Sequence, residues 1–304
     1  MNPIRRILAA TDLSGPSRHA VDRAVRLADE TGARLAALHV VGQGAVDGLR
    51  RMLGEDTPEV EARILDEARG ALDRLLAELV ATRSVSAEAR VAVGVIVGEI
   101  VAQAEAEDAD LLVLGARGEG FLRHLLLGTT AERLLRKTNR PVLLVRQLPH
   151  DHYRRVVVAV DFSASSVAAL RLARTLAPAA ELVLLHAFEV PFEGKLQFAG
   201  VTDVAIARYR HQARQDALRE LEAFAAAAGS AAAGARLSVH HGEPSRVILE
   251  REQQEDCDLL VVGKRGKSVV EELLLGSVTK HVLAEASGDV LVASAGPARA
   301  SAPA

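Results

Sequence analysis

A glycine spacing suited to phosphate binding occurs twice in this chain of 304 residues. The two copies are Gly115, Gly118, Gly128 and Thr129, and Gly263, Gly266, Gly276 and Ser277. Each copy follows an apolar run typical of a buried strand and leads into a helical pattern. A glycine turn ahead of a helix leaves backbone N–H groups free to bind an anion, usually a phosphate. Gly118 and Gly266 would let the backbone approach the ligand or adopt positive φ. The spacing therefore predicts two copies of one fold, each with a nucleotide site.

Charged and hydroxyl side chains accompany both motifs. Asp12 and Asp161 end the first apolar run of their halves, and ligands of open parallel sheets collect at the carboxyl ends of the strands. Arg117 and Arg265 share one position in the two loops and would neutralise phosphate charge. Two segments would direct N–H groups and hydroxyls at phosphate: Gly128-Thr129-Thr130 and Gly276-Ser277-Val278-Thr279.

Each of these features also has a purely structural interpretation. A glycine turn can start a helix without any ligand. Asp12 and Asp161 would cap the following helices, although nearby serines are available for that role. The two loop arginines are equally consistent with solvated charges. Asp110 and Asp258, ahead of the fourth strands, are interpreted as structural carboxylates that cap turns.

The histidines and the cysteine point to structure rather than to metal chemistry. His39 and His186 end the second strands and are expected to be hydrogen-bonded near the core. His240 and His241 are adjacent on a strand, so their side chains point to opposite faces and form a poor metal site. Cys257 is the only cysteine. A single cysteine can form neither an internal disulfide nor a metal cluster of several cysteines. We expect Cys257 to be a small core residue.

The elements that must position these groups repeat at offsets of 147 to 149 residues, which indicates a duplicated domain. Strands of the first half are expected at Ile4–Ala10, Leu35–Val41, Glu88–Val95, Asp110–Gly115 and Pro141–Val145. Helices are expected at Ser17–Thr31, from Thr57 to about Ala81, at Glu99–Glu107 and at Thr129–Thr138, with a loop before Thr57. Alternating strands and helices, with strands apolar on both faces, predict an α/β fold. We expect two tandem open five-stranded parallel sheets with helices on both faces.

Composition narrows the class of protein. The net charge is −3, aromatic residues make up 3% and tryptophan is absent, which argues against nucleic-acid binding. No apolar run reaches the ~18 residues that span a bilayer, and the N-terminus lacks a secretory pattern. We therefore expect a cytoplasmic protein without membrane insertion. The expected organisation is a domain at 1–147, a linker at 148–153, a domain at 154–295 and a disordered tail at 296–304.

Taken together, these features resemble the universal stress protein family. The resemblance covers nearly the whole chain and rests on Asp12, Asp161 and the full G-x2-G-x9-G-[ST] pattern of both halves. It implies a Rossmann-type domain of the adenine nucleotide α-hydrolase-like group in each half. It also implies one ATP site per half, with Mg²⁺ bound alongside ATP.

The resemblance assigns roles within each site. Asp12 and Asp161 would recognise adenine, and the backbone of Val40 and Ala187, just past the second strands, would line the adenine pocket. The first glycines of the motifs, Gly115 and Gly263, would border the ribose, and the segments 128–130 and 276–279 would hold phosphates. The second copy matches the usual run more closely, because the first copy continues with alanine where the second has Thr279.

The leading hypothesis is an ATP-binding stress-response or regulatory protein. One alternative is an ATP-independent interaction module, and a weaker one is a slow adenine-nucleotide hydrolase. No G-x-S-x-G elbow, Walker A motif or G-x-G-x-x-G after the first strand occurs, and we find no placed general base. At most a weak ATPase is expected. The halves are expected to pair through the strands Val142–Val145 and Val290–Ala293, and two chains to form a homodimer.

Overall fold

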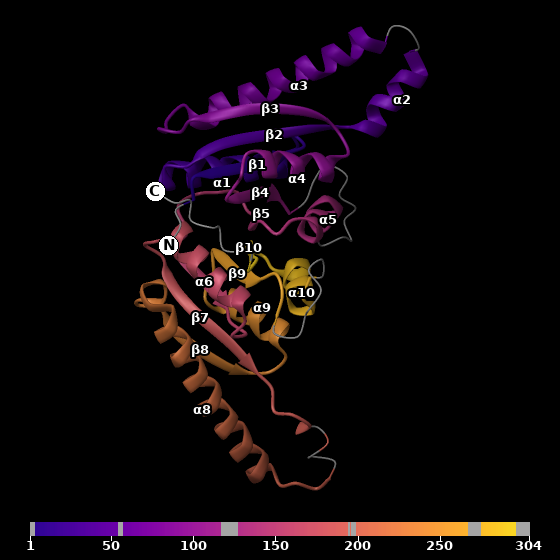
Figure 1. Ribbon diagram of the computed structural model, residues 1–304. Coiled ribbons are helices and arrows are strands. Elements are labelled where there is room, and N and C mark those ends of the chain that lie inside the picture. The colour runs from indigo at the N-terminus through magenta and orange to yellow at the C-terminus, as the bar shows by residue number, and fades with distance from the viewer. Residues whose placement is uncertain are drawn as a thin grey trace, which may run out of the picture. The chain divides into compact units, whose positions relative to one another are not determined.

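The computed structural model describes residues 4–53, 57–116, 127–193, 195, 199–266 and 275–295. The chain divides into two compact units, Met1–His152 and Tyr153–Ala304 (Figure 1). The predicted tail, 296–304, lies outside the described residues. No helix in the described ranges has the length and apolarity needed to cross a membrane.

The first unit is built on a five-stranded sheet in which all pairs are parallel. The strand order is β3-β2-β1-β4-β5. The strands are β1 (Arg6–Thr11), β2 (Arg34–Gly42), β3 (Ala87–Gly94), β4 (Leu111–Gly115) and β5 (Val142–Val145). The order reverses between β1 and β4, so the carboxyl ends of these two strands form the switch point where ligands bind in such sheets.

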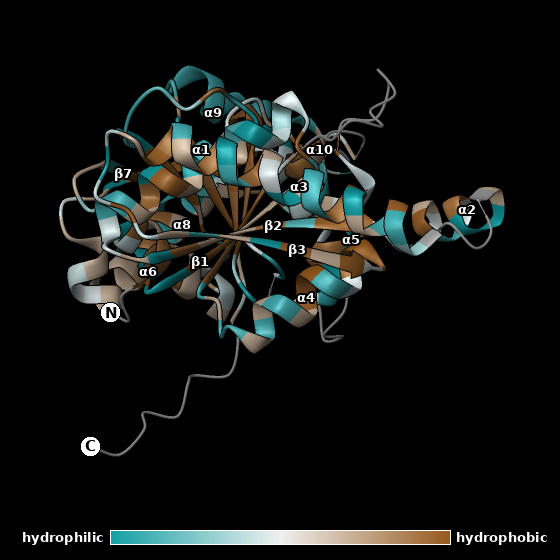
Figure 2. Cartoon of the chain, turned by 90° about the horizontal axis from the view of Figure 1, so that it is seen from above, coloured by the Kyte–Doolittle hydropathy of each residue, from teal (hydrophilic) through white to brown (hydrophobic). Residues whose placement is uncertain are grey.

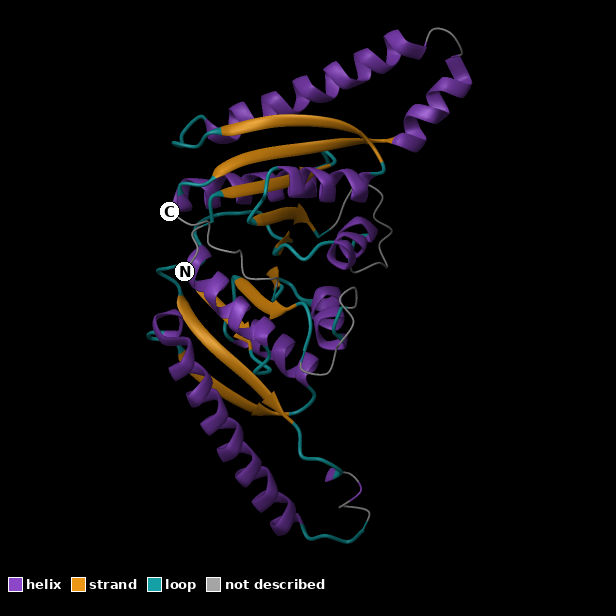
Figure 3. Cartoon of the chain, viewed as in Figure 1, coloured by secondary structure: helices purple, strands orange, loops and turns teal. Residues whose placement is uncertain are grey.

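Helices cover both faces of this sheet (Figure 3). They are α1 (Gly15–Thr31), α2 (Gln43–Leu53), α3 (Thr57–Val80), α4 (Ile96–Ala106) and α5 (Thr129–Lys137). The connections from β1 to β2 and from β2 to β3 step toward the β3 edge of the sheet. The connections from β3 to β4 and from β4 to β5 step toward the β5 edge. Right-handed connections therefore put α1 and α3 on one face, and α4 and α5 on the other. The packing agrees, because α1 contacts α3 and α4 contacts α5.

The second unit repeats this plan with a parallel sheet in the order β8-β7-β6-β9-β10. Its strands are β6 (Arg155–Ala159), β7 (Glu181–Phe188), β8 (Arg236–His241), β9 (Leu259–Gly263) and β10 (Asp289–Ala293). Its helices are α6 (Ala164–Leu176), α8 (Asp203–Ala228), the 3₁₀ turn η2 (Gly229–Ala232), α9 (Pro244–Gln254) and α10 (Ser277–Glu285). Here the switch point lies between β6 and β9.

The core of each unit lies along the central strands. Leu111 to Leu114 of β4 and Leu259 to Val262 of β9 are buried throughout, as expected for strands covered on both faces. Figure 2 shows the strands mostly brown, while the helices carry teal stretches. The predicted α/β class with two tandem parallel sheets is confirmed.

One expected loop is a helix. The glycine-rich stretch before Thr57 predicts a loop, but α2 occupies Gln43–Leu53. Its Val46 is buried, Gln43 Nε2 donates to Asp47 Oδ1 at 2.9 Å, and Arg50 pairs with Glu61 of α3 at 2.9 Å. These contacts outweigh the ~1 kcal/mol that each interior glycine costs a helix, so local propensity misses this element.

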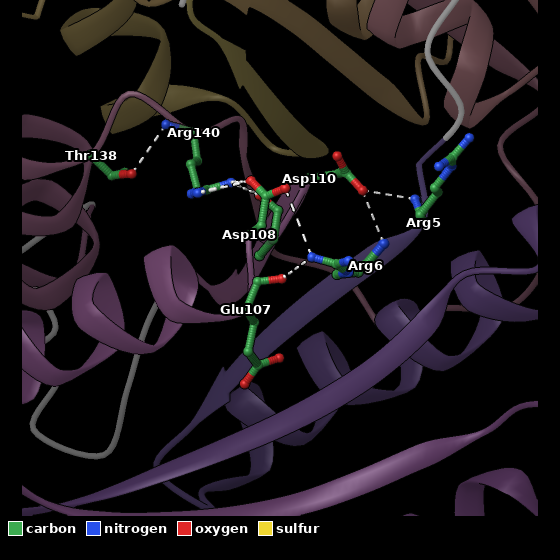
Figure 4. A network of polar contacts seen from close by, with 8 residues as sticks. Arg5, Arg6, Glu107, Asp108, Asp110, Thr138 and Arg140 are labelled. Carbon is green, nitrogen blue, oxygen red and sulfur yellow. Dashed lines mark hydrogen bonds and ion pairs between the residues drawn. The ribbon is translucent and has the colours of Figure 1, made fainter. Parts of the chain in front are cut away.

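A polar network ties the amino-terminal edge of the first sheet together (Figure 4). Asp110 Oδ2 accepts the backbone N–H of Arg5 at 2.8 Å and of Arg6 at 3.1 Å. This carboxylate joins the start of β4 to the start of β1. Beside it, Arg140 Nη1 donates to Asp108 Oδ1 at 3.3 Å. The structural interpretation of Asp110 is confirmed.

The second unit has the same tie. Asp258 Oδ2 accepts the backbone N–H of Arg154 at 2.8 Å and of Arg155 at 2.9 Å, which confirms its structural role. The neighbouring Cys257 is buried, and burial raises the pKa of its thiol to about 12. It is the core residue expected from the sequence.

Candidate functional site

A tight turn follows β6 and presents Asp161 at the switch point of the second unit. Phe162 has φ +62°, and its counterpart Leu13 in the first unit has φ +65°. A non-glycine residue in this region costs about 1 kcal/mol or more and persists only where its surroundings hold it. The Phe162 ring packs on His186 with centroids 4.4 Å apart and on Phe224 at 6.0 Å. These contacts hold the turn and so fix the direction of Asp161.

Hydrogen bonds orient the Asp161 carboxylate. Its Oδ1 accepts from Ser166 Oγ at 2.6 Å and from Ser163 N at 3.1 Å, while Asp161 N donates to Ser166 Oγ at 3.0 Å. Its Oδ2 lies against Gly266, where a Cβ would come within 2.8 Å of it. The helix cap itself is Ser163, whose side chain accepts from Ser166 N. Asp161 therefore links the first strand of this unit to the glycine motif.

The three glycines of the second motif have different surroundings. A Cβ on Gly263 would meet Ser165 Cβ at 2.8 Å, so this glycine permits α6 to pack on the end of β9. Gly266 permits the close approach of Asp161, and its φ is not positive. Gly276 has φ −58° and ψ 148°, and a Cβ there would find its nearest neighbour, Thr279 Oγ1, at 3.5 Å. The fold alone does not require glycine at this third position.

Helix α10 begins at this third glycine without a side-chain cap. The described N-termini of α6, α8 and α9 are capped by Ser163, Thr202 and Glu243 respectively. An uncapped N-terminus presents backbone N–H groups and the positive end of the helix dipole. Among the described α-helices α6, α8, α9 and α10, the one without a side-chain cap is thus the one that follows the glycine motif.

A cavity of about 220 Å³ lies at these strand ends. Its walls contain all nine site residues that the sequence predicts for this half: Asp161, Ala187, Gly263, Arg265, Gly266, Gly276, Ser277, Val278 and Thr279. Residues 105 or more positions apart along the chain, such as Asp161 and Gly266, therefore meet at one site.

Sequence reasoning missed several residues of the cavity wall. They are Ala159, Val160, Ser166, Leu185, His186, Pro244, Ile248 and Val262. Most end a strand or begin α6 or α9, so the rule that ligands collect at carboxyl ends could have included them. His186 Nδ1 lies 2.7 Å from Val160 O, and His39 Nδ1 lies 2.9 Å from Thr11 O. The prediction that both are hydrogen-bonded structural histidines is confirmed.

In the first unit, the predicted site residues that the structure describes lie at the same places in the fold as their counterparts in the second unit. Asp12 follows β1, and its Oδ1 accepts from Ser14 N at 3.0 Å and Ser14 Oγ at 2.5 Å. Val40, expected just past the second strand, is buried within β2, and Ala187 likewise lies within β7, because both strands are longer than predicted. Gly115 ends β4. Gly128 precedes α5, which begins with Thr129 and Thr130 and has no side-chain cap. Arg117 and Gly118 lie outside the described residues.

Comparison with known proteins identifies the family. The family model described as "Universal stress protein family" matches residues 3–146 and again residues 152–294. The chain belongs to the universal stress protein family. Each of its two units corresponds to one universal stress protein domain.

Relatives and solved structures agree with this tandem organisation. The universal stress protein E homolog of Haemophilus influenzae is 23% identical over 300 residues, covering 94% of this chain and 96% of the relative. A universal stress protein of Methanocaldococcus jannaschii is 31% identical over 146 residues, which is 48% of this chain and 84% of the relative. The crystal structure of a universal stress protein from Archaeoglobus fulgidus has a TM-score of 0.64 and 21% identity, covering 96% of this chain and 98% of that one. This last likeness shows the shared fold.

In the part of the chain that the structure describes, the side chains of this universal stress protein do not form a metal-binding site of their own. Those residues contain no group of three or more His, Cys, Asp or Glu arranged to hold a metal ion. His240 Nε2 lies 2.7 Å from Ser238 Oγ, and His241 Nε2 lies 2.8 Å from Glu193 Oε2. The adjacent histidines thus engage separate partners, as their opposite directions on a strand predict.

Proposed function

We propose that this universal stress protein binds ATP, one molecule in each half, and acts as a nucleotide-dependent regulator of the stress response. One observation carries the proposal. Nine residues predicted from the motif and its context surround a single cavity at the switch point of the second sheet. The first half supplies the same strand ends and the same start of α5.

The chemistry of the cavity suits a mononucleotide. Val160, Leu185 and Ile248 offer apolar surface for the faces of a base. Ser277 and the uncapped start of α10 offer donors to phosphate. The cavity of about 220 Å³ is smaller than the ~300–1,000 Å³ of sites for drug-sized ligands. We therefore assign its apolar walls to the base and ribose, and its walls at Arg265, Gly276 and Ser277 to the start of the phosphate chain, which extends beyond the cavity.

The donor set fits Mg²⁺ only as a partner of bound phosphates. Mg²⁺ is usually held by one or two carboxylates together with substrate phosphates and water. Among the described residues that line the cavity, Asp161 is the carboxylate; because it is assigned to adenine, Ser277 would be the side chain that meets Mg²⁺ beside the phosphates. When bound, Mg²⁺ would neutralise phosphate charge.

The geometry favours binding over hydrolysis. Asp161 Oδ1 already accepts two hydrogen bonds, from Ser166 Oγ and Ser163 N, so its neighbours hold this oxygen in place. His186 directs Nδ1 at a backbone carbonyl. The proposal therefore makes nucleotide occupancy, rather than turnover, the functional output. We extend it to a cytoplasmic setting and a homodimer, which fractionation and sedimentation equilibrium check.

The test is isothermal titration of the full chain with ATP and Mg²⁺. Mass spectrometry of nucleotide released from freshly denatured protein gives the stoichiometry. We expect two ATP per chain, and loss of binding in the double variant Gly128→Leu, Gly276→Leu. Gly48→Leu on α2 is the control, because a Cβ there meets nothing nearer than Arg51 Nη2 at 4.0 Å. Absence of heat with the wild-type chain would overturn the proposal.

A further inference from the structure

The two proposed sites differ at one position just after the glycine motif. The third residue of α10 is Thr279, and the third residue of α5 is Ala131. Both side chains are buried, at 5% and 2% exposed. The sequence predicts that Thr279 binds phosphate directly, but its hydroxyl has another partner.

Thr279 Oγ1 donates to the backbone oxygen of Gly263 at 2.7 Å. This bond ties the first turn of α10 to the last residue of β9. The backbone bond from Gly276 N to Lys264 O, at 3.0 Å, has its counterpart in the first half, from Gly128 N to Ala116 O at 2.8 Å. The backbone tie is thus common to both halves. The threonine tie belongs to the second half, because alanine has no hydroxyl to donate.

A second difference lies at the aspartate. In the second half Ser166 Oγ donates to Asp161 Oδ1 at 2.6 Å. Its counterpart Ser17 directs its Oγ elsewhere, to Thr11 Oγ1 at 2.8 Å and to Ser14 O at 3.0 Å. Thr11 stands where the second half has valine at position 160. The hydroxyl of Thr11 thus engages Ser17, and in the first half Ser14 Oγ donates to Asp12 Oδ1 instead. Each aspartate therefore accepts a serine hydroxyl, but from a different position of the following segment.

We infer that Thr279 pre-organises the second site through its bond to Gly263 O, and that the first site lacks this tie because Ala131 stands at the matching position. The two halves therefore bind adenine nucleotide with unequal affinity, and the second half fills first. This inference rests on the proposed function of both sites. Thr279 acts as a positioning residue: it fixes the start of α10 against β9 before the ligand arrives, so less ordering is needed on binding.

The experiment isolates each site by blocking the other. A Gly128→Leu chain reports the second site, and a Gly276→Leu chain reports the first, both by calorimetric titration with ATP and Mg²⁺. We expect tighter binding in the Gly128→Leu chain. Within it, Thr279→Val removes the hydroxyl at nearly constant volume and should weaken binding about two- to tenfold, the range of one net hydrogen bond. Thr279→Ser keeps the hydroxyl and should restore the affinity.

The reciprocal change supplies the matched control. Ala131→Thr in the Gly276→Leu chain introduces the missing hydroxyl and should tighten the first site. Equal affinities of the two blocked chains, or an unchanged Kd in Thr279→Val, would overturn the inference. A stability loss in Thr279→Val without a change in Kd would show a merely structural threonine and also overturn it. Absence of binding in the unblocked wild type would instead overturn the proposed function.

Discussion

Substitution of two glycines of one motif by alanine should have different consequences. Gly263→Ala places a Cβ 2.8 Å from Ser165 Cβ and 3.3 Å from Arg265 O. These atoms belong to packed backbone and a short helical side chain, so α6 must move away from β9. Overpacking of this kind costs about 1–3 kcal/mol of unfolding free energy.

Gly276→Ala places its Cβ in ordinary contact, at 3.5 Å from Thr279 Oγ1 and 3.7 Å from Lys264 O. Its φ of −58° and ψ of 148° suit alanine. Removing glycine at such a φ and ψ stabilises a protein by about 0.4–1 kcal/mol, because the unfolded chain loses freedom. Gly276 is, however, the N-cap of α10, and alanine is a poorer N-cap than glycine. We therefore expect nearly unchanged stability, together with weakened ATP binding, since the methyl group occupies the approach to the phosphates.

Tyrosine fluorescence makes the assay specific for the second unit. The chain has two tyrosines and no tryptophan, and both Tyr153 and Tyr209 lie in that unit. Tyr153 is 2% exposed, and its hydroxyl donates to Asp289 Oδ2 at 2.7 Å, so unfolding changes its environment. Urea titrations of the two variants without ligand give the comparison. If Gly276→Ala lost as much stability as Gly263→Ala, the division into a fold glycine and a ligand glycine would be refuted.

Three further outcomes are expected. Asp258→Ala leaves the N–H groups of Arg154 and Arg155 without their carboxylate partner and should cost about 1–3 kcal/mol in urea unfolding, with no change in ATP affinity. Cys257, with its pKa raised to about 12 by burial, should resist iodoacetamide at pH 8 and react only in urea. For Glu243, burial raises the pKa, but hydrogen bonds from the first turn of α9 outweigh this effect and lower it below 4.5. The ionised Glu243 carboxylate should therefore contribute fully to the free energy of unfolding above pH 4.5, and this contribution should be lost as the pH falls through the lowered pKa. The difference in unfolding free energy between the wild type and Glu243→Gln should accordingly disappear in acid. A gap that stayed constant with pH would contradict this assignment.

Much of the fold follows from local pattern, because the strands are short apolar runs between recognisable helix starts. The helix over Gln43–Leu53 does not, since its glycines conceal it and contacts such as Arg50–Glu61 arise only after α3 is in place. The end of α1 at Thr31 is predicted, while its start at Gly15 is two residues earlier than expected.

The candidate site likewise has features that the sequence predicts and features that it does not. Residue types and spacing bring Asp161, the glycines and the start of α10 to one strand edge. The partner of a hydroxyl cannot be deduced from spacing, because it depends on distances of a few tenths of an ångström. The hydroxyl of Thr279 thus bonds to Gly263 O. The hydroxyl of Ser166 bonds to Asp161, whereas that of Ser17 bonds to Thr11. The apolar walls, such as Ile248, require knowledge of which helix start faces the cavity.

The turn after β6 packs against α8 as well as against β7. Phe162 is held in a left-handed conformation, with its ring between His186 of β7 and Phe224 of α8. Asp161 is the preceding residue, and the backbone between them has little freedom to absorb a displacement. The carboxylate therefore lies one residue from a ring that contacts α8, a helix of 26 residues. Aromatic packing and the contact surface for a ligand thus share one turn.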